Sequence, residues 1–222
     1  MSVQISENTL QFLSNLALNN NKDWFTENKA VYTNAQQNMI SFIENLITEM
    51  GSFDEEILKI DPKKTLFRIY RDVRFSKDKS PYKTNMGASL GMGKGSQKAG
   101  YYLHVEPGKS FLAAGIYMPN SSDLKTIRKE ISLYSDDFLK VINDKNFKSL
   151  FKALDQEDQL KKIPQGFEKE DPMAEFLKLK NFIVVYSLKD EDLMKKEAPK
   201  KFAEIFKAAK PLNDFLNRAL EF

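Results

Sequence analysis

The chain has 222 residues, a formal net charge of +3 at neutral pH and no cysteine, which excludes disulfides, zinc–thiolate sites, iron–sulfur clusters and thiol nucleophiles. Hydrophobic residues make up 41% and charged residues 29%, as in ordinary globular proteins, which argues against a disordered chain. No apolar run approaches the roughly 20 residues of a membrane span, and the first ten residues lack the blocks of a signal peptide. We therefore expect a soluble, cytoplasmic protein without a membrane partner.

The first sixty residues are predicted to be helical. Ser6 occupies an N-cap position ahead of leucines spaced three residues apart, which predicts an amphipathic helix. The clearest helical periodicity runs from Trp24 to Met50, and a short helical turn is expected at 55–59. Trp24 and Phe25 are interpreted as core residues rather than as part of a binding site.

The middle of the chain changes to strand patterning. Four β-rich segments lie at 65–73, 85–92, 101–106 and 110–118, separated by turn-forming residues. The links between them are too short to hold crossover helices, so we predict an antiparallel meander. A short apolar run at 182–186 predicts a further, buried strand.

Helices return after residue 120. They are predicted at 123–131, at 136–142, at 144–154, at 171–179, and from about residue 199 onward with a kink or restart at Pro211. Nothing has the composition of a linker or a repeat. We therefore predict a single α+β domain over residues 1–222, in which a mainly antiparallel sheet of about five strands packs with helices from both termini.

Positive charge is concentrated in one segment, residues 68–83. Its six basic and two acidic residues give +4, so the remaining chain carries −1. Arg68, Arg71 and Arg74 follow one another at three-residue spacing, with apolar and aromatic residues between them. A merely solvated run of charges does not need this apolar interleaving. The segment is therefore the first place to look for an anion-binding site.

Strand alternation gives the arginines different environments. On a strand at 65–73, Arg68 and Arg74 share one face, whereas Arg71 lies on an otherwise apolar face. A guanidinium among hydrophobic side chains needs an acidic partner or an opening into a pocket. A buried ion pair that only stabilises the fold explains Arg71 equally well.

The segment predicts an anionic ligand that carries phosphate or carboxylate. Arginine forks bind such groups in bidentate fashion, and lysines act as point charges. Asp72 would orient an arginine or act as an acid or base, and two residues of the following loop would close over the ligand. The predicted ligand contacts are Arg68, Arg71, Arg74, Asp78, Lys79 and Tyr82.

The only histidine lies within the predicted strand at 101–106. Tyr102, His104 and Glu106 would line one face of this strand, and such a trio can serve acid–base chemistry. An ordinary solvent-facing strand surface is the alternative. The candidate catalytic residues are therefore Asp72, His104 and Glu106. No spacing of acidic residues and histidine supports a metal site, and no cofactor is identified.

Residues 68–83 resemble the signature of a bacterial family, the domain-of-unknown-function 2461 family. The matching pattern is Arg-x-x-Arg-Asp-x-Arg-Phe-x-x-x-Asp-Lys-x-x-Tyr, and its positions here are Arg68, Arg71, Asp72, Arg74, Phe75, Asp78, Lys79 and Tyr82. The likeness extends over nearly the whole chain. One departure is Ala113-Ala114-Gly115, where a run of glycines is expected. The resemblance implies one intact bacterial domain, and it implies no activity or mechanism.

The favoured hypothesis is a protein that binds an anionic small molecule through the arginine-rich segment. A nucleic-acid-associated binding module is the first alternative, although the charge pattern supports nucleic acid only weakly. The second is a structural or protein-interaction domain whose arginines are paired internally. The sequence does not decide whether the protein is an enzyme; hydrolysis or transfer at a phosphorylated small molecule would be the least strained chemistry.

Overall fold

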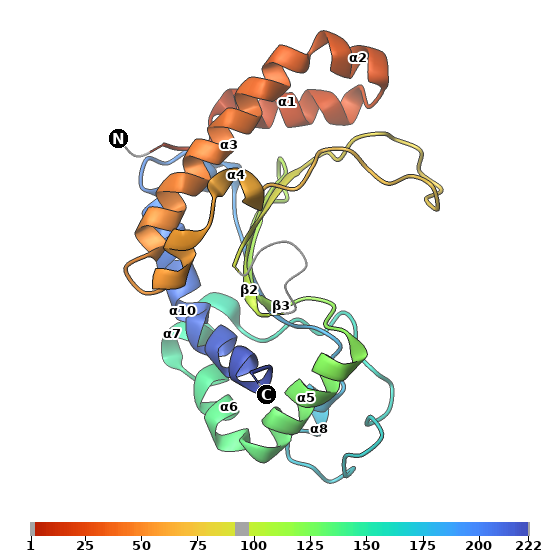
Figure 1. Ribbon diagram of the computed structural model, residues 1–222, viewed down its shortest axis with the longest axis vertical. Helices are drawn as coiled ribbons and strands as arrows, with labels where there is room; N and C mark the ends of the chain where they lie inside the picture. Colours follow the sequence, from red (N-terminus) through yellow and green to blue (C-terminus); the bar gives the residue numbers. More distant parts are fainter. Residues whose placement is uncertain (1–2, 92–97, 222) are drawn as a thin grey trace. The chain divides into compact units, whose positions relative to one another are not determined.

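The computed structural model describes residues 3–91 and 98–221, and within them the chain forms one antiparallel sheet of four strands in the order β1-β2-β3-β4 (Figure 1). The strands are β1 (Met86–Leu90), β2 (Gly100–Val105), β3 (Phe111–Ile116) and β4 (Phe182–Ser187). The α+β class and the antiparallel sheet are confirmed. The last residue of the predicted strand at 85–92 lies outside the described residues.

The predicted strand at 65–73 is wrong, which reduces the strand count from about five to four. Leu66 and Tyr70 each form only an isolated antiparallel bridge, to Ala88 and Tyr82. The chain bends at Ile69, where the side chain is buried. Leu66 and Ile69, three residues apart, are therefore both buried, and the two-residue alternation on which a strand face depends is lost.

The chain divides into two compact units. Unit 1 contains the described residues of 3–91, 102–112 and 187–204, and unit 2 those of 98–101, 113–186 and 205–221. Strands β2, β3 and β4 and helix α10 (Ala198–Ala219) contribute residues to both units. That all of 1–222 is a single domain stays a prediction.

Unit 1 contains the N-terminal helices, which are α1 (Glu7–Leu18), α2 (Lys22–Glu27), α3 (Lys29–Met50), the 3-10 turn η1 (Glu55–Lys59) and α4 (Pro62–Thr65), together with α9 (Asp190–Leu193). Ser6 caps α1 by accepting a hydrogen bond from the Thr9 amide at 3.2 Å. The helix predicted from Trp24 to Met50 is interrupted at Asn28, which ends α2 and begins α3.

The core of unit 1 lies between helix α3 and the sheet. Helix α3 packs against α1 and β1, and its Phe42 is fully buried against Phe202 of α10, with ring centroids 5.7 Å apart. In β2, Leu103 and Val105 are fully buried. The alternate side chains, which belong to the opposite face of β2, keep partial exposure.

Unit 2 contains α5 (Ser121–Leu133), α6 (Ser135–Ile142), α7 (Lys145–Phe151) and α8 (Ala174–Leu177), in agreement with four predicted helices apart from shorter or longer ends. Helix α10 runs through Pro211 without a restart. Gly115 has φ +121°, and a Cβ there would lie 2.0 Å from the Phe182 carbonyl oxygen, so only glycine fits this contact with β4.

Helices of bilayer-crossing length and hydropathy do not occur among the described residues.

Candidate functional site

The arginine-rich segment forms a hairpin-like projection of unit 1, here called the arginine hairpin (residues 66–88). Its arms pair through hydrogen bonds from the amides of Phe67 to Gly87 (2.9 Å), Lys83 to Ile69 (2.7 Å) and Arg71 to Pro81 (2.9 Å). Residues 72–80 form the loop between the arms. In Figure 1 the hairpin is the yellow segment that extends beyond the sheet and returns to β1.

Aromatic side chains and one asparagine hold the part of the hairpin that adjoins its loop. Tyr82 is 5% exposed and stacks on Phe25 of α2, with ring centroids 4.0 Å apart, and Tyr70 packs beside both rings. Asn20 clamps the Tyr82 backbone: its side-chain amide donates to the carbonyl at 3.0 Å, and its oxygen accepts from the amide at 3.1 Å. Tyr82, predicted to close over a ligand, is thus a buried anchor.

Arg71 is paired with an acidic residue inside the hairpin. Its guanidinium donates to Asp78 and, at 3.2 Å, to the Ser80 carbonyl. Asp78 also accepts from the Ser80 amide (2.9 Å) and hydroxyl (2.6 Å). These Ser80 hydrogen bonds first, and Arg71 second, lower the pKa of Asp78 to about 2. The pair closes the neck of the loop.

Arg74 is paired as well. Its Nε and Nη2 donate to the two carboxylate oxygens of Asp72 at 3.0 and 2.7 Å, a bidentate fork that lowers the pKa of Asp72. Both side chains are exposed. Lys79 donates to the Val73 carbonyl at 2.9 Å. Asp72, a candidate acid or base, is therefore engaged by Arg74.

Arg68 differs from the other two arginines. It is exposed, and no carboxylate in the described part of the chain lies within ion-pair distance of it. The positive charge of Arg68 nevertheless contributes to lowering the pKa of Asp72. The three evenly spaced arginines thus comprise two internal ion pairs and one guanidinium that faces solvent.

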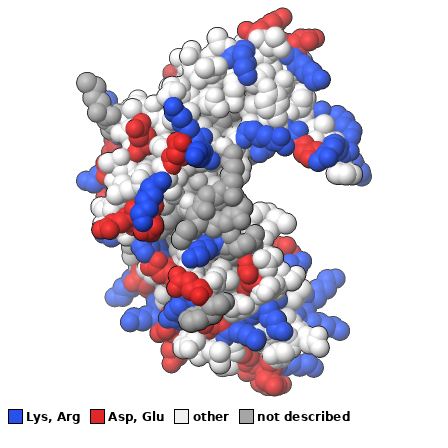
Figure 2. All heavy atoms as spheres, viewed as in Figure 1, with Lys and Arg blue, Asp and Glu red and all other residues white. Residues whose placement is uncertain are grey.

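The tip of the hairpin presents an aromatic ring among basic side chains. Phe75 is 96% exposed, and the Arg74 guanidinium lies 5.8 Å from the centroid of its ring. Lys77 and Lys79 are exposed in the same loop. Figure 2 shows lysine and arginine side chains gathered on this projection.

Tyr102 and His104 on one face of β2, and Glu106 directly after the strand, form a hydrogen-bonded row, here called the histidine row. The Tyr102 hydroxyl lies 3.1 Å from His104 Nδ1, and His104 Nε2 lies 3.1 Å from a Glu106 carboxylate oxygen. Burial, and then the charge of Glu106, raise the pKa of Tyr102 to about 12. Tyr102 is therefore the donor to Nδ1, and Nε2–H donates to Glu106.

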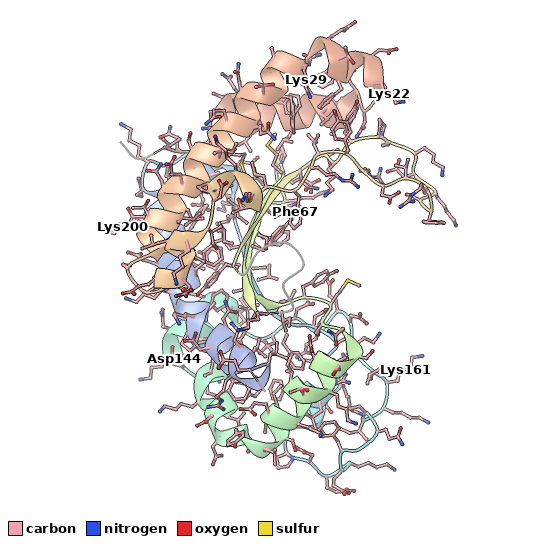
Figure 3. All side chains as sticks on the ribbon, viewed as in Figure 1. Lys22, Lys29, Phe67, Asp144, Lys161 and Lys200 are labelled. Carbon is pink, nitrogen blue, oxygen red and sulfur yellow. The ribbon has the colours of Figure 1, made fainter. Side chains whose placement is uncertain are left out.

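Neighbouring side chains enclose the histidine row. Phe111 of β3 stacks on the imidazole, with centroids 4.6 Å apart, and Thr84 donates to Glu106 at 3.3 Å. Phe67, labelled in Figure 3 at the base of the hairpin, lies 6.1 Å from the Tyr102 ring. Both imidazole nitrogens have hydrogen-bond partners, so a ligand can bond to the imidazole directly only by displacing one of them.

Several of these partners are missing from the sequence-based prediction. Asn20 carries no signal, because its contact with Tyr82 joins residues 62 positions apart, and Phe111 carries none, because its stacking on His104 depends on how β2 and β3 pair. Gly87 carries one: a glycine within a strand pattern marks a close approach, and a Cβ there would lie 2.3 Å from the Tyr102 hydroxyl oxygen. Among the described residues, no cluster of three or more acidic or histidine side chains is arranged to hold a metal ion.

These features define an α+β protein whose first unit carries a basic hairpin beside a hydrogen-bonded histidine. A family model described as "Conserved hypothetical protein (DUF2461)" matches residues 8–215, and the chain belongs to this family. The family, whose function is unknown, is the one indicated by the resemblance. Comparison with curated proteins and with solved structures found no match.

Proposed function

We propose that unit 1 binds an anionic ligand, bearing phosphate or carboxylate, through the arginine hairpin. The observation that supports this is the exposed guanidinium of Arg68, which has no carboxylate partner among the described residues. It belongs to a segment of net charge +4, which attracts anions. Because no carboxylate of the described residues pairs with this guanidinium, an anion can gain a charge-assisted fork there without displacing one of them.

The other predicted contacts receive different roles. Arg71 and Arg74 are engaged by Asp78 and Asp72, so an anion would have to displace a carboxylate to bind them. In this proposal Arg68 is the direct contact. The loop and the adjoining parts of the two arms are held by Arg71, Arg74, Asp78, Lys79 and Tyr82. The proposal assigns no reaction to Asp72, His104 or Glu106.

The experiment is calorimetric titration of the full chain with inorganic tripolyphosphate and, separately, citrate at low ionic strength. Arg68→Ala is expected to weaken binding at least about tenfold, the value of a lost charge-assisted hydrogen bond. Lys145→Ala removes the same charge from an exposed position in unit 2 and is the matched control. Preference between the two titrants distinguishes phosphate from carboxylate.

A second variant tests the role of the internal pairs. Asp72→Asn removes the partner of an exposed arginine without changing side-chain size, so it is expected to strengthen anion binding by exposing the fork of Arg74. If neither titrant binds, or if Arg68→Ala and the wild type bind equally, the arginines are structural and the proposal fails.

A further inference from the structure

We propose that the anionic ligand is a single-stranded nucleic acid, with Arg68 at its phosphates and the ring of Phe75 stacked on one of its bases. This inference rests on the proposed anion binding and adds to it the class of ligand. Tyr82, the aromatic residue among the predicted ligand contacts, is buried against Phe25 and so is unavailable for stacking on a base.

Phe75 is the first observation in favour. At 96%, its exposure is the greatest of the large hydrophobic side chains in the described ranges. It lies within the loop between the two arms of the hairpin, residues 72–80. Every nucleobase has a π-face, so one exposed aromatic ring is a complete platform for one base. The stack requires an unstacked base, which favours a single strand over a duplex.

The charges around the ring are the second observation. Arg74 lies over Phe75, Lys77 and Lys79 are exposed on the same loop, and Arg68 lies on the first arm. Arg68 and Phe75 lie seven positions apart along the same hairpin, so the cations and the ring are offered at several points of one surface, as a strand with several phosphates requires. Single-strand binding surfaces combine such cations, which follow the backbone, with aromatic platforms.

A lipid surface fits the same tip less well. Phe75 is a single apolar side chain between Arg74 and Ser76, and two carboxylates, those of Asp72 and Asp78, lie in the same exposed loop. Burying the ring below the headgroups would bring these carboxylates to the anionic interface. Stable attachment to a membrane takes more apolar area than one ring provides.

The test is fluorescence anisotropy of a labelled oligothymidylate of about 12 nucleotides with the full chain, between about 50 and 200 mM salt. Phe75→Ala is expected to weaken binding about tenfold with an unchanged salt slope, because a stack is lost and no charge. Arg68→Ala is expected to weaken binding and to reduce the slope of log affinity against log salt by about 0.7, the value of one phosphate contact.

Two further variants make the result specific. Tyr117→Ala removes another exposed aromatic side chain, in unit 2, and is expected to change nothing. Phe75→Trp is expected to keep the affinity and to show quenching of the new indole on binding. Both substitutions at Phe75 lie at a fully exposed position, so the fold is expected to be retained.

The outcomes separate the inference from the proposed function. Oligonucleotide binding that Phe75→Ala leaves unchanged overturns base stacking and leaves anion binding intact. Binding of tripolyphosphate without the oligonucleotide, or Phe75-dependent binding to phosphatidylserine vesicles in place of it, overturns nucleic acid as the ligand. Failure of tripolyphosphate, citrate and oligonucleotide alike removes both proposals.

Discussion

Asp78 illustrates how single residues set the charge that the hairpin presents. Its carboxylate accepts from the amide and hydroxyl of Ser80 and from Arg71, so one acidic side chain both closes the loop and neutralises an arginine. Arg68 has no equivalent, because the acidic residues of the segment are committed to the other two arginines. The three arginines are evenly spaced in the sequence, yet they are not equally available to bind an anion.

The lowered pKa of Asp78 predicts the pH range in which its contacts with Ser80 and Arg71 stabilise the loop. Its folded-state pKa, about 2, is below the ordinary 3.8, so the stabilisation of the loop is complete above pH about 4 and is lost as the pH falls toward 2. The amide proton of Ser80, which donates to Asp78, is expected to titrate in NMR spectra with an apparent pKa near 2. A titration of this amide near 4 would contradict the contact.

At the scale of elements, helices and strands differ in how far they can be predicted. Caps and periodicity are local, so α1, η1 and α5 to α7 lie close to their predicted positions. The segment at 65–73 has strand composition, yet its pairing is limited to isolated bridges. The bend at Ile69 places the buried residues Leu66 and Ile69 three positions apart, out of strand alternation. For the candidate site, the histidine row was predicted as a face, whereas the partners of the arginines depend on loop conformation.

Strand β1 and the histidine row are coupled through Gly87. Gly87→Ala would place a Cβ 2.3 Å from the Tyr102 hydroxyl oxygen, so we expect a loss of about 1–3 kcal/mol in the free energy of unfolding measured in urea. Tyr102→Phe removes that oxygen and leaves ring carbons at 3.0 Å, so the double variant should recover part of the loss relative to the sum of the single variants. Simple additivity would show that the two positions do not meet.

At the scale of the whole molecule, the boundary between the two units runs through helices and strands rather than between them. Strands β2, β3 and β4 and helix α10 have residues in both units, so no single cut in the sequence separates them. The family model matches residues 8–215, a range that contains residues of both units. That the two units form one domain stays a prediction, which an unfolding experiment can test.

One domain predicts one unfolding transition. The single tryptophan, Trp24, belongs to unit 1, so its fluorescence reports on that unit, and hydrogen exchange at the β4 amides of residues 182–186 reports on unit 2. Both probes are expected to give the same midpoint and the same free energy of unfolding. Two separate midpoints would mean that the units unfold independently.

The chain of 222 residues contains one histidine, so the imidazole ¹⁵N signals in an NMR spectrum report on the histidine row alone. The ring nitrogens of His104 are bonded to Tyr102 on one side and Glu106 on the other, so their ¹⁵N resonances distinguish the two sides without assignment of any other ring. A compound library can therefore be screened against the unmodified protein, and each hit sorted at once by whether it disturbs this resonance pair.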